Sequence, residues 1–178
     1  MTKKFDQQLV KAAAAGDDEE VRRLIPLANT KNNEALKAAL HSHCSACVEM
    51  LLPVSDLSDP DEISGMLIYA VESLDTACVK LFMGVCNPKF DNSLALRCAV
   101  VRGYTNIVDA LFPVSEPRVA LDDLQEKIPR GHNRGGVIED RVAKFQERVE
   151  RFESEQQNKV LSAAVNSDHN PVKNKQKM

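Results

Sequence analysis

The chain has 178 residues and a formal net charge of -3 at pH 7, with 43% apolar residues, only 4% aromatic residues and no tryptophan. Its core must therefore be built from Ala, Leu and Val, which favours closely packed helices over a sheet sandwich. The weakly negative charge gives no reason to expect a nucleic acid or an anionic membrane as partner.

The first residues carry lysines but no apolar run, so we expect no secretory signal. No apolar run approaches the roughly 18–20 residues that are needed to span a bilayer. The five cysteines are an odd number, which without an export signal indicates free thiols in a reducing compartment. We therefore expect a cytoplasmic protein that has no membrane partner.

An internal repeat of four units fills most of the chain. When one leucine is taken as offset zero of each unit, an alanine follows three residues later and a valine twelve residues later. These positions are Leu9, Leu36, Leu67 and Leu96, then Ala12, Ala39, Ala70 and Ala99, and finally Val21, Val48, Val79 and Val108. The leucines are separated by 27, 31 and 29 residues. Fixed offsets joined by linkers of varying length predict a stack of equivalent units.

Each unit has the pattern of two short helices. Offsets 0, 3 and 4 share one helical face, and so do offsets 12, 15 and 16. Gly16 and Gly103 stand at offset 7, where they predict a turn between the two helices. Pro26, Pro53 and Pro113 follow the second helix and predict its end. One such pair cannot bury its apolar stripe alone, but a stack of pairs can.

Residues 5–117 resemble the ankyrin-repeat family, in particular divergent bacterial and phage repeats. The resemblance rests on ALKAALHSHCSACVEMLLPVSD (35–56) and LALRCAVVRGYTNIVDALFPVSEP (94–117), which follow the family pattern L-x-x-A-A-x-x-G-x-x-x-x-V-x-x-L-L. It implies an all-α solenoid of about four helix pairs that binds another protein. Because the units lack the TPLH opening and the Gly-Ala-Asp hairpin of the family, we expect short irregular loops between them.

The C-terminal third departs from the repeat. Residues 118–136 are expected to form a cap helix and a mobile linker, and residues 137–165 an amphipathic helix. The apolar seam of this helix is spaced 4, 3, 4, 3, at Ile138, Val142, Phe145, Val149 and Phe152. It either docks against the repeats or pairs with a second copy, which would make a homo-oligomer.

The last residues allow two interpretations. Residues 166–178 are polar and are expected to be a disordered tail. Alternatively, residues 158–172 form a degenerate fifth repeat, because Leu161 and Ala164 keep offsets 0 and 3.

The segment HSHCSAC has a spacing that could bind zinc, through His41, His43, Cys44 and Cys47. The repeat favours another role, because Cys47 stands at offset 11, which a cysteine or an isoleucine fills in the next two units. No second CxxC pair completes a ligand set. We therefore expect a buried Cys47 and no metal or cofactor.

Catalytic motifs are absent from the sequence. It contains no P-loop, dinucleotide-binding turn, HExxH or GxSxG motif, and Cys86 and Cys98 lie in no recognisable nucleophile motif. Arg130, Arg134 and Arg141 could contact phosphates together with His132, but acidic residues surround them, which is typical of a solvated linker. The chain is therefore expected not to be an enzyme.

A partner is expected on the exposed face of the first helices and on the loop tips before them. In ankyrin proteins the corresponding strip lines the concave surface. The predicted binding residues are His41, Ser42, Tyr69, Glu72, Ser73, Asp91, Asn92, Val101 and Arg102. The leading hypothesis is a non-enzymatic module that inhibits, sequesters or tethers a protein partner, in a phage or bacterial host-interaction or defence context. The alternative is a structural component that self-assembles through its C-terminal helix.

Overall fold

The structure of the protein is a computed structural model that describes residues 2–31, 33–128 and 136–168. Over these ranges the chain forms helices and no strand, which confirms the all-α prediction for this part of the molecule. None of these helices combines the length and the apolar character that crossing a membrane requires.

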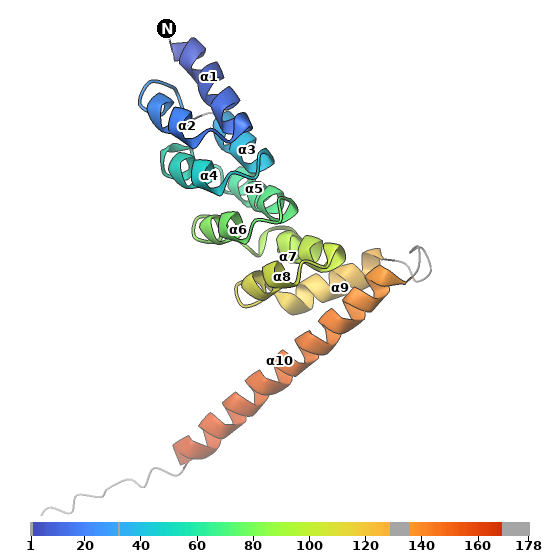
Figure 1. Ribbon diagram of the computed structural model, residues 1–178. Coiled ribbons are helices and arrows are strands. Elements are labelled where there is room, and N and C mark those ends of the chain that lie inside the picture. The colour runs from blue at the N-terminus through green and yellow to red at the C-terminus, as the bar shows by residue number, and fades with distance from the viewer. Residues whose placement is uncertain (1, 32, 129–135, 169–178) are drawn as a thin grey trace, which may run out of the picture.

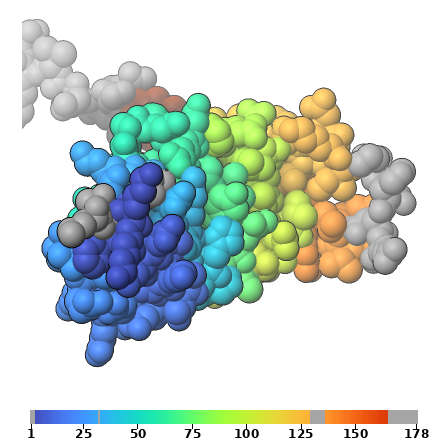
Figure 2. Space-filling view, turned by 90° about the horizontal axis from the view of Figure 1, so that it is seen from above, coloured from blue at the N-terminus to red at the C-terminus, as the bar shows by residue number. Residues whose placement is uncertain are grey.

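The repeat units fold as helix pairs that stack in sequence order. The first helices of the four units are α1 (Thr2–Ala15), α3 (Glu34–His41), α5 (Pro60–Glu72) and α7 (Phe90–Arg102). The second helices are α2 (Asp18–Leu24), α4 (Ser45–Leu51), α6 (Thr76–Met83) and α8 (Thr105–Leu111). First helices pack on first helices and second on second, so the molecule has two parallel rows (Figure 1). The view from above shows the units in the same order (Figure 2).

The core runs through the whole stack. The four repeat leucines are each at most 1% exposed, and the repeat alanines and valines are buried beside them. Alanine suits its position because neighbouring first helices approach closely there, and a larger side chain would overfill the contact. The leucine repeat of the sequence therefore lines one shared interior.

All four units turn between their helices through a left-handed residue at offset 7. Gly16 and Gly103 have φ values of +69° and +76°, and His43 and Leu74 have φ values of +57° and +60°. Glycine adopts this conformation without strain, whereas other residues pay roughly 1–2 kcal/mol. The middle units thus keep the turn geometry although they lack the glycine.

A polar side chain at offset -3 fastens each unit to its own linker. It accepts a hydrogen bond from the backbone N–H at offset 20, with donor–acceptor distances of 2.7, 3.0, 3.3 and 3.0 Å along the chain. The donor–acceptor pairs are Asn29 with Asp6, Asp56 with Asn33, Asn87 with Ser64, and Glu116 with Ser93. We call these contacts the linker pins. They explain why Asn33, Ser64 and Ser93 are polar residues inside the core.

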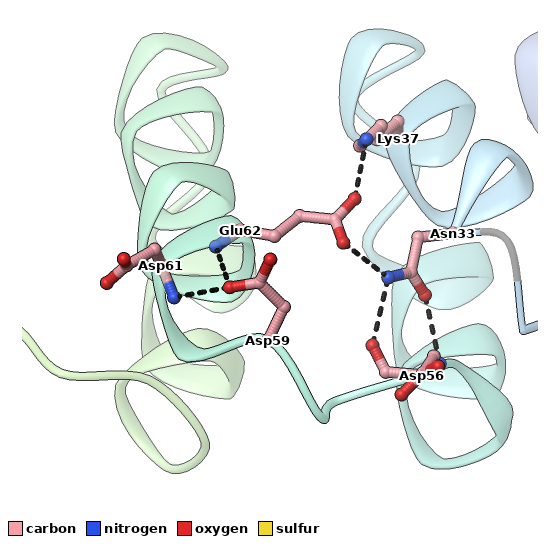
Figure 3. A network of polar contacts seen from close by, with 6 residues as sticks. All are labelled: Asn33, Lys37, Asp56, Asp59, Asp61 and Glu62. Atoms are coloured by element: carbon pink, nitrogen blue, oxygen red, sulfur yellow. Dashed lines mark hydrogen bonds and ion pairs between the residues drawn. The ribbon is translucent and has the colours of Figure 1, made fainter.

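The second pin also reaches the next unit (Figure 3). Asn33 Nδ2 donates to the Asp56 carbonyl at 2.9 Å and to Glu62 Oε2 at 3.3 Å. Glu62 in turn lies 2.7 Å from Lys37 Nζ, so α3 and α5 are joined by polar contacts at their N-terminal ends. The linker between α4 and α5 contains the 3-10 turn η1 (Leu52–Val54).

Two further helices close the C-terminal end of the stack. Helix α9 (Pro117–Lys127) packs against α7, and the long helix α10 (Val137–Asp168) packs against α9 and α7 (Figure 1). Phe145 and Val149 of α10 are buried. The Phe112 ring meets the rings of Phe145 and Phe152 edge to face, with centroids 6.0 and 5.3 Å apart. The apolar seam of α10 is therefore used within the chain.

This docking corresponds to the first of the two alternatives for the seam. Val142, Phe145, Val149 and Phe152 pack within the chain's own core, whereas pairing of the seam with a second copy stays a prediction. Polar contacts also join α10 to α9, because Arg118 pairs with Glu153 and Gln125 donates to Gln146 at 3.0 Å. A second copy could not use the seam without displacing the chain's own contacts.

Beyond Phe152 the helix leaves the body of the molecule. From Ser154 to Ala164 its side chains are exposed, and the helix continues without interruption to Asp168. Residues 158–168 therefore do not start another helix pair, which corrects the fifth-repeat interpretation for this part. The predicted tail from 169 on, and Arg130, His132 and Arg134 of the predicted linker, lie outside the described residues.

Candidate functional site

Four of the predicted binding residues form one continuous exposed feature on the first helices. His41 ends α3, Tyr69 and Glu72 lie on the last turns of α5, and Arg102 ends α7. We call these four residues the outer strip. They lie on the outer face because they occupy offsets 2, 5 and 6, which point away from the leucine at offset 0.

The first half of the outer strip is an aromatic contact between units. The His41 and Tyr69 rings lie 5.3 Å apart with an interplanar angle of 42°. Tyr69 nevertheless remains 45% exposed. His41 is oriented from the other side because its Nδ1 lies 2.7 Å from the Lys37 carbonyl. The ring of Tyr69 is therefore presented to solvent in a supported position.

The second half is an ion pair between the next two units. Arg102 Nη2 lies 3.1 Å from Glu72 Oε1, and both side chains are about half exposed. An exposed pair of this kind contributes only about 0–1 kcal/mol to stability. The strip thus offers an aromatic ring at Tyr69 and, on the same and the next unit, a carboxylate and a guanidinium that pair with each other.

Three other predicted binding residues have structural roles. The Ser42 hydroxyl donates to the Ala13 carbonyl at 2.7 Å, which joins the first two units. The Ser73 hydroxyl donates to the Ala70 carbonyl within α5 at 2.7 Å. Val101 is half-buried, and its carbonyl accepts a hydrogen bond from Arg141 Nη1 at 2.6 Å. Each of these groups is bonded within the chain, and the part of these three residues in partner binding stays a prediction.

Asp91 and Asn92 do not join the outer strip. They begin α7, whereas Arg102 ends it, and together with Ser93 they form a left-handed segment with φ between +46° and +59°. The Asp91 carbonyl accepts a bond from Arg97 at 2.8 Å, and Asn92 Nδ2 donates to Asp123 at 3.3 Å. Asp91 and Asn92 remain exposed while they make these contacts to α7 and α9, and their role in partner binding stays a prediction.

The cysteine thiols near these surfaces are poorly suited to nucleophilic chemistry. Burial raises the pKa values of Cys47 and Cys78 to about 12 and that of Cys86 to about 11. Burial also raises the pKa of Cys98, and the negative charge of Glu72 raises it further. Since the thiolate is the nucleophile, these four groups remain unreactive thiols near neutral pH.

The HSHCSAC segment is used for helix capping. Cys44 is the N-cap of α4, where its Sγ accepts the Cys47 N–H at 3.3 Å, and Asp17 and Asp75 hold the equivalent N-cap positions in units one and three. Among the described residues, no group of three or more His, Cys, Asp or Glu side chains is placed to hold a metal ion. Cys47 is buried, as its offset predicts.

Two sets of residues were missed in the sequence. The linker pins recur at offset -3, but the residue there is Asp, Asn, Ser and Ser in the four units. The sequence signal is therefore a side-chain oxygen that can accept a hydrogen bond, and not one residue type. Arg141, Lys144 and Arg148 of α10 lie around a hollow that faces the last repeat unit. Their spacing of three and four residues beside the apolar seam was the signal for one basic flank of this helix.

Comparisons of the chain with protein-family models, with curated proteins and with solved structures find no match.

Proposed function

We propose that the protein is a non-enzymatic binding module whose outer strip captures a protein partner and thereby inhibits, sequesters or tethers it. The observation that supports this proposal best is the half-exposed Tyr69, held between His41 and the Glu72–Arg102 pair across three successive units. Tyr and Arg are enriched among the residues that dominate protein–protein binding energy. Rigid presentation also lowers the entropy that binding must overcome.

The arrangement of the units supports the same proposal. We infer that the four helix pairs are a divergent solenoid of the ankyrin type, in which the second, third and fourth units each contribute one or two side chains to a shared face. A surface of this kind suits a macromolecule better than a metabolite, because its recognition groups are spread over several helices instead of converging in a deep pocket. A bacterial or phage host-interaction setting is part of the proposal through the sequence resemblance.

A double variant of the strip tests the proposal. Immobilised full-length protein, and the same protein with Tyr69→Ala and Arg102→Glu, are used to capture proteins from a bacterial lysate, which are then quantified by mass spectrometry. We expect specifically captured proteins to fall at least tenfold in the variant, because an interface anchor is worth roughly 2 kcal/mol or more. Thermal unfolding of the variant should be nearly unchanged.

The matched control is Leu57→Ala with Lys80→Glu, which removes one exposed apolar side chain and reverses one exposed positive charge away from the strip. Capture by this control should equal capture by the unmodified chain. If the strip variant retains full capture, the outer strip is not the binding site.

A further inference from the structure

A second surface lies where α10 crosses the last repeat unit. A hollow of about 230 Å³ opens between the α7–α8 turn and α10. Val100, Val108 and Phe145 line it, and each is at most 8% exposed. This volume is below the roughly 300–1,000 Å³ of pockets that enclose cofactors and drug-sized ligands. It suits a single bulky side chain.

Three cations of α10 surround this apolar hollow. Arg141, Lys144 and Arg148 all line it, and they lie three and four residues apart on one flank of the helix. The opposite flank carries Glu153, which pairs with α9. Helix α10 therefore presents its positive side to the hollow and a negative group to the body of the molecule.

The cations are held in place in different ways. Arg141 donates to the uncharged Val101 carbonyl, so this contact orients its charge without neutralising it. Lys144 lies 3.2 Å from Asp140, but both side chains are more than 70% exposed. Such an exposed i,i+4 pair is weak and can exchange for another carboxylate.

Arg148 is fixed most firmly of the three. It pairs with Asp109 of α8, and its guanidinium carbon lies 4.3 Å from the centre of the Phe112 ring. A guanidinium held over an aromatic ring is favourably placed, because the face of the ring is negative. Arg141 and Arg148 are thus positioned at the edge of the hollow before any ligand arrives, whereas the exposed Lys144 is free to exchange its partner.

We propose that this hollow binds a short acidic segment of a partner protein, with one bulky apolar side chain inserted and flanking carboxylates on the cations. Charge complementarity selects the occupant: carboxylates match guanidinium groups in geometry, and an apolar side chain matches the lining of Val100, Val108 and Phe145. A peptide supplies both kinds of group within a few residues.

This site adjoins the outer strip but shares no side chain with it. Val100 and Gly103, which line the hollow, flank Val101 and Arg102 at the end of α7. One partner could therefore contact both surfaces, although each can be tested alone. The second site goes beyond the proposed function, because Tyr69→Ala, which changes no charge, should weaken partner capture by the outer strip but leave the binding of an acidic peptide unchanged.

The test measures fluorescence anisotropy of labelled peptides on the full-length protein. The probe is a peptide with one leucine between pairs of glutamates, compared with the same peptide carrying alanine in place of leucine, and with lysine in place of glutamate. We expect the leucine peptide to bind about tenfold more tightly than the alanine peptide. The affinity of the leucine peptide should decrease as the salt concentration is raised from roughly 50 to roughly 300 mM. The lysine peptide should not bind.

Two variants locate the site. Lys144→Glu reverses an exposed charge at the hollow and should weaken binding about tenfold or more. Lys159→Glu makes the same change on the exposed part of α10 and should have no effect. Thr105→Trp places a large ring at the edge of the hollow and should also block the peptide. Circular dichroism and thermal unfolding establish that each variant is folded.

Several results would overturn the proposal. One is equal affinity for the leucine and alanine peptides, which would mean that the peptide binds through its charges alone and that the hollow does not contribute. Another is an equal effect of Lys144→Glu and Lys159→Glu. A third is Lys144-dependent binding of the protein to phosphatidylserine vesicles without binding of the peptide, which would assign the basic flank to a lipid surface.

Discussion

Arg97 of α7 and Asp123 of α9 form an ion pair in which each side chain is only 7% exposed. Arg97 also donates to the Asp91 carbonyl, and Lys127 Nζ lies 2.9 Å from Asp123. Each of these two buried charges therefore has a second polar partner at the junction between the last repeat unit and α9. Because an unpaired buried charge is expensive, this junction tolerates the loss of both charges better than the loss of one.

Removal of one partner tests this relationship. Arg97→Met should destabilise the protein by about 3–5 kcal/mol in urea denaturation, because it leaves Asp123 buried without its guanidinium. The double variant Arg97→Met with Asp123→Leu should recover most of this loss. The control Arg102→Met removes an exposed pair and should cost less than about 1 kcal/mol. Equal losses for Arg97→Met and Arg102→Met would contradict the assignment.

Leu74→Gly should stabilise the protein. Leu74 has a φ of +60° and a side chain 59% exposed, so glycine relieves backbone strain at little packing cost. After the extra chain entropy of glycine is subtracted, we expect a gain of about 0.5–1 kcal/mol in the free energy of unfolding. Ala77→Gly, at an exposed position within α6, should instead lose about 1 kcal/mol. A loss at both positions would argue against the left-handed turn.

Ser64→Ala tests the linker pins. Ser64 is buried and accepts the Asn87 N–H, so the alanine variant leaves that donor without its partner. We expect a loss of about 1–2 kcal/mol. Ser73→Ala is the matched control, because its hydroxyl donates to the Ala70 carbonyl of its own helix and satisfies no backbone N–H of a linker among the described residues. If both substitutions had the same small effect on the free energy of unfolding, the linker pin would not contribute to stability.

Stability should fall at alkaline pH through the buried thiols. The pKa of Cys78 is about 12 in the folded protein, above its ordinary value, because burial disfavours the thiolate. The unfolded chain therefore loses this proton first, and the stabilisation present below about pH 8.5 decreases by at most roughly 1.4 kcal/mol per pH unit above it. Cys78→Val removes the titrating group, and unit four has isoleucine at this position.

The measurement compares urea denaturation of the two proteins at pH 7 and at about pH 10. Lysine and tyrosine titration is common to both, so the difference between them isolates the thiol. We expect the valine variant to lose less stability over this interval. Parallel losses in the two proteins would show that Cys78 does not carry the effect.

Hydrogen exchange should divide α10 into two parts. Residues 137–152 contain the buried Phe145 and Val149, so their amides should exchange slowly. From Ser154 to Ala164 the helix is exposed, and a helical segment of that length is only marginally stable in water. Mass spectrometry of peptic fragments would resolve the two parts. Uniform protection along the helix would indicate a partner surface for the exposed part.

The sequence was informative where side-chain periodicity determines the structure. Leu67 and Ala70 share a helical face in any helix, so their burial followed from spacing alone. The seam of α10 was also recognisable, but its partner was not, because Phe145 and Val149 have the same spacing whether they meet the repeats or a second helix. Only the position of Phe112 in space decides between the two.

Polar contacts were harder to predict for a different reason. The pin position is Asp6 in one unit and Ser64 in another, and different side chains satisfy the same N–H. Asn92 was predicted to be a partner-binding loop tip, and its contact with Asp123 was not foreseen because no rule of spacing pairs two residues 31 positions apart. Arg97 appeared unremarkable for the same reason. Long-range polar partners depend on the packing of α9, which the repeat pattern does not include.

The part of α10 from Glu153 to Asp168 is suited to the attachment of a label or a surface linker. Its 16 residues extend roughly 24 Å at the rise of an α-helix. A dye or a surface linker attached at Asn158 would stand clear of Tyr69 and of Lys144, so the molecule can be immobilised with both faces open to solution. In a cell, a second protein bound to this exposed part of α10 would lie away from the repeat units, which could keep their own ligand bound.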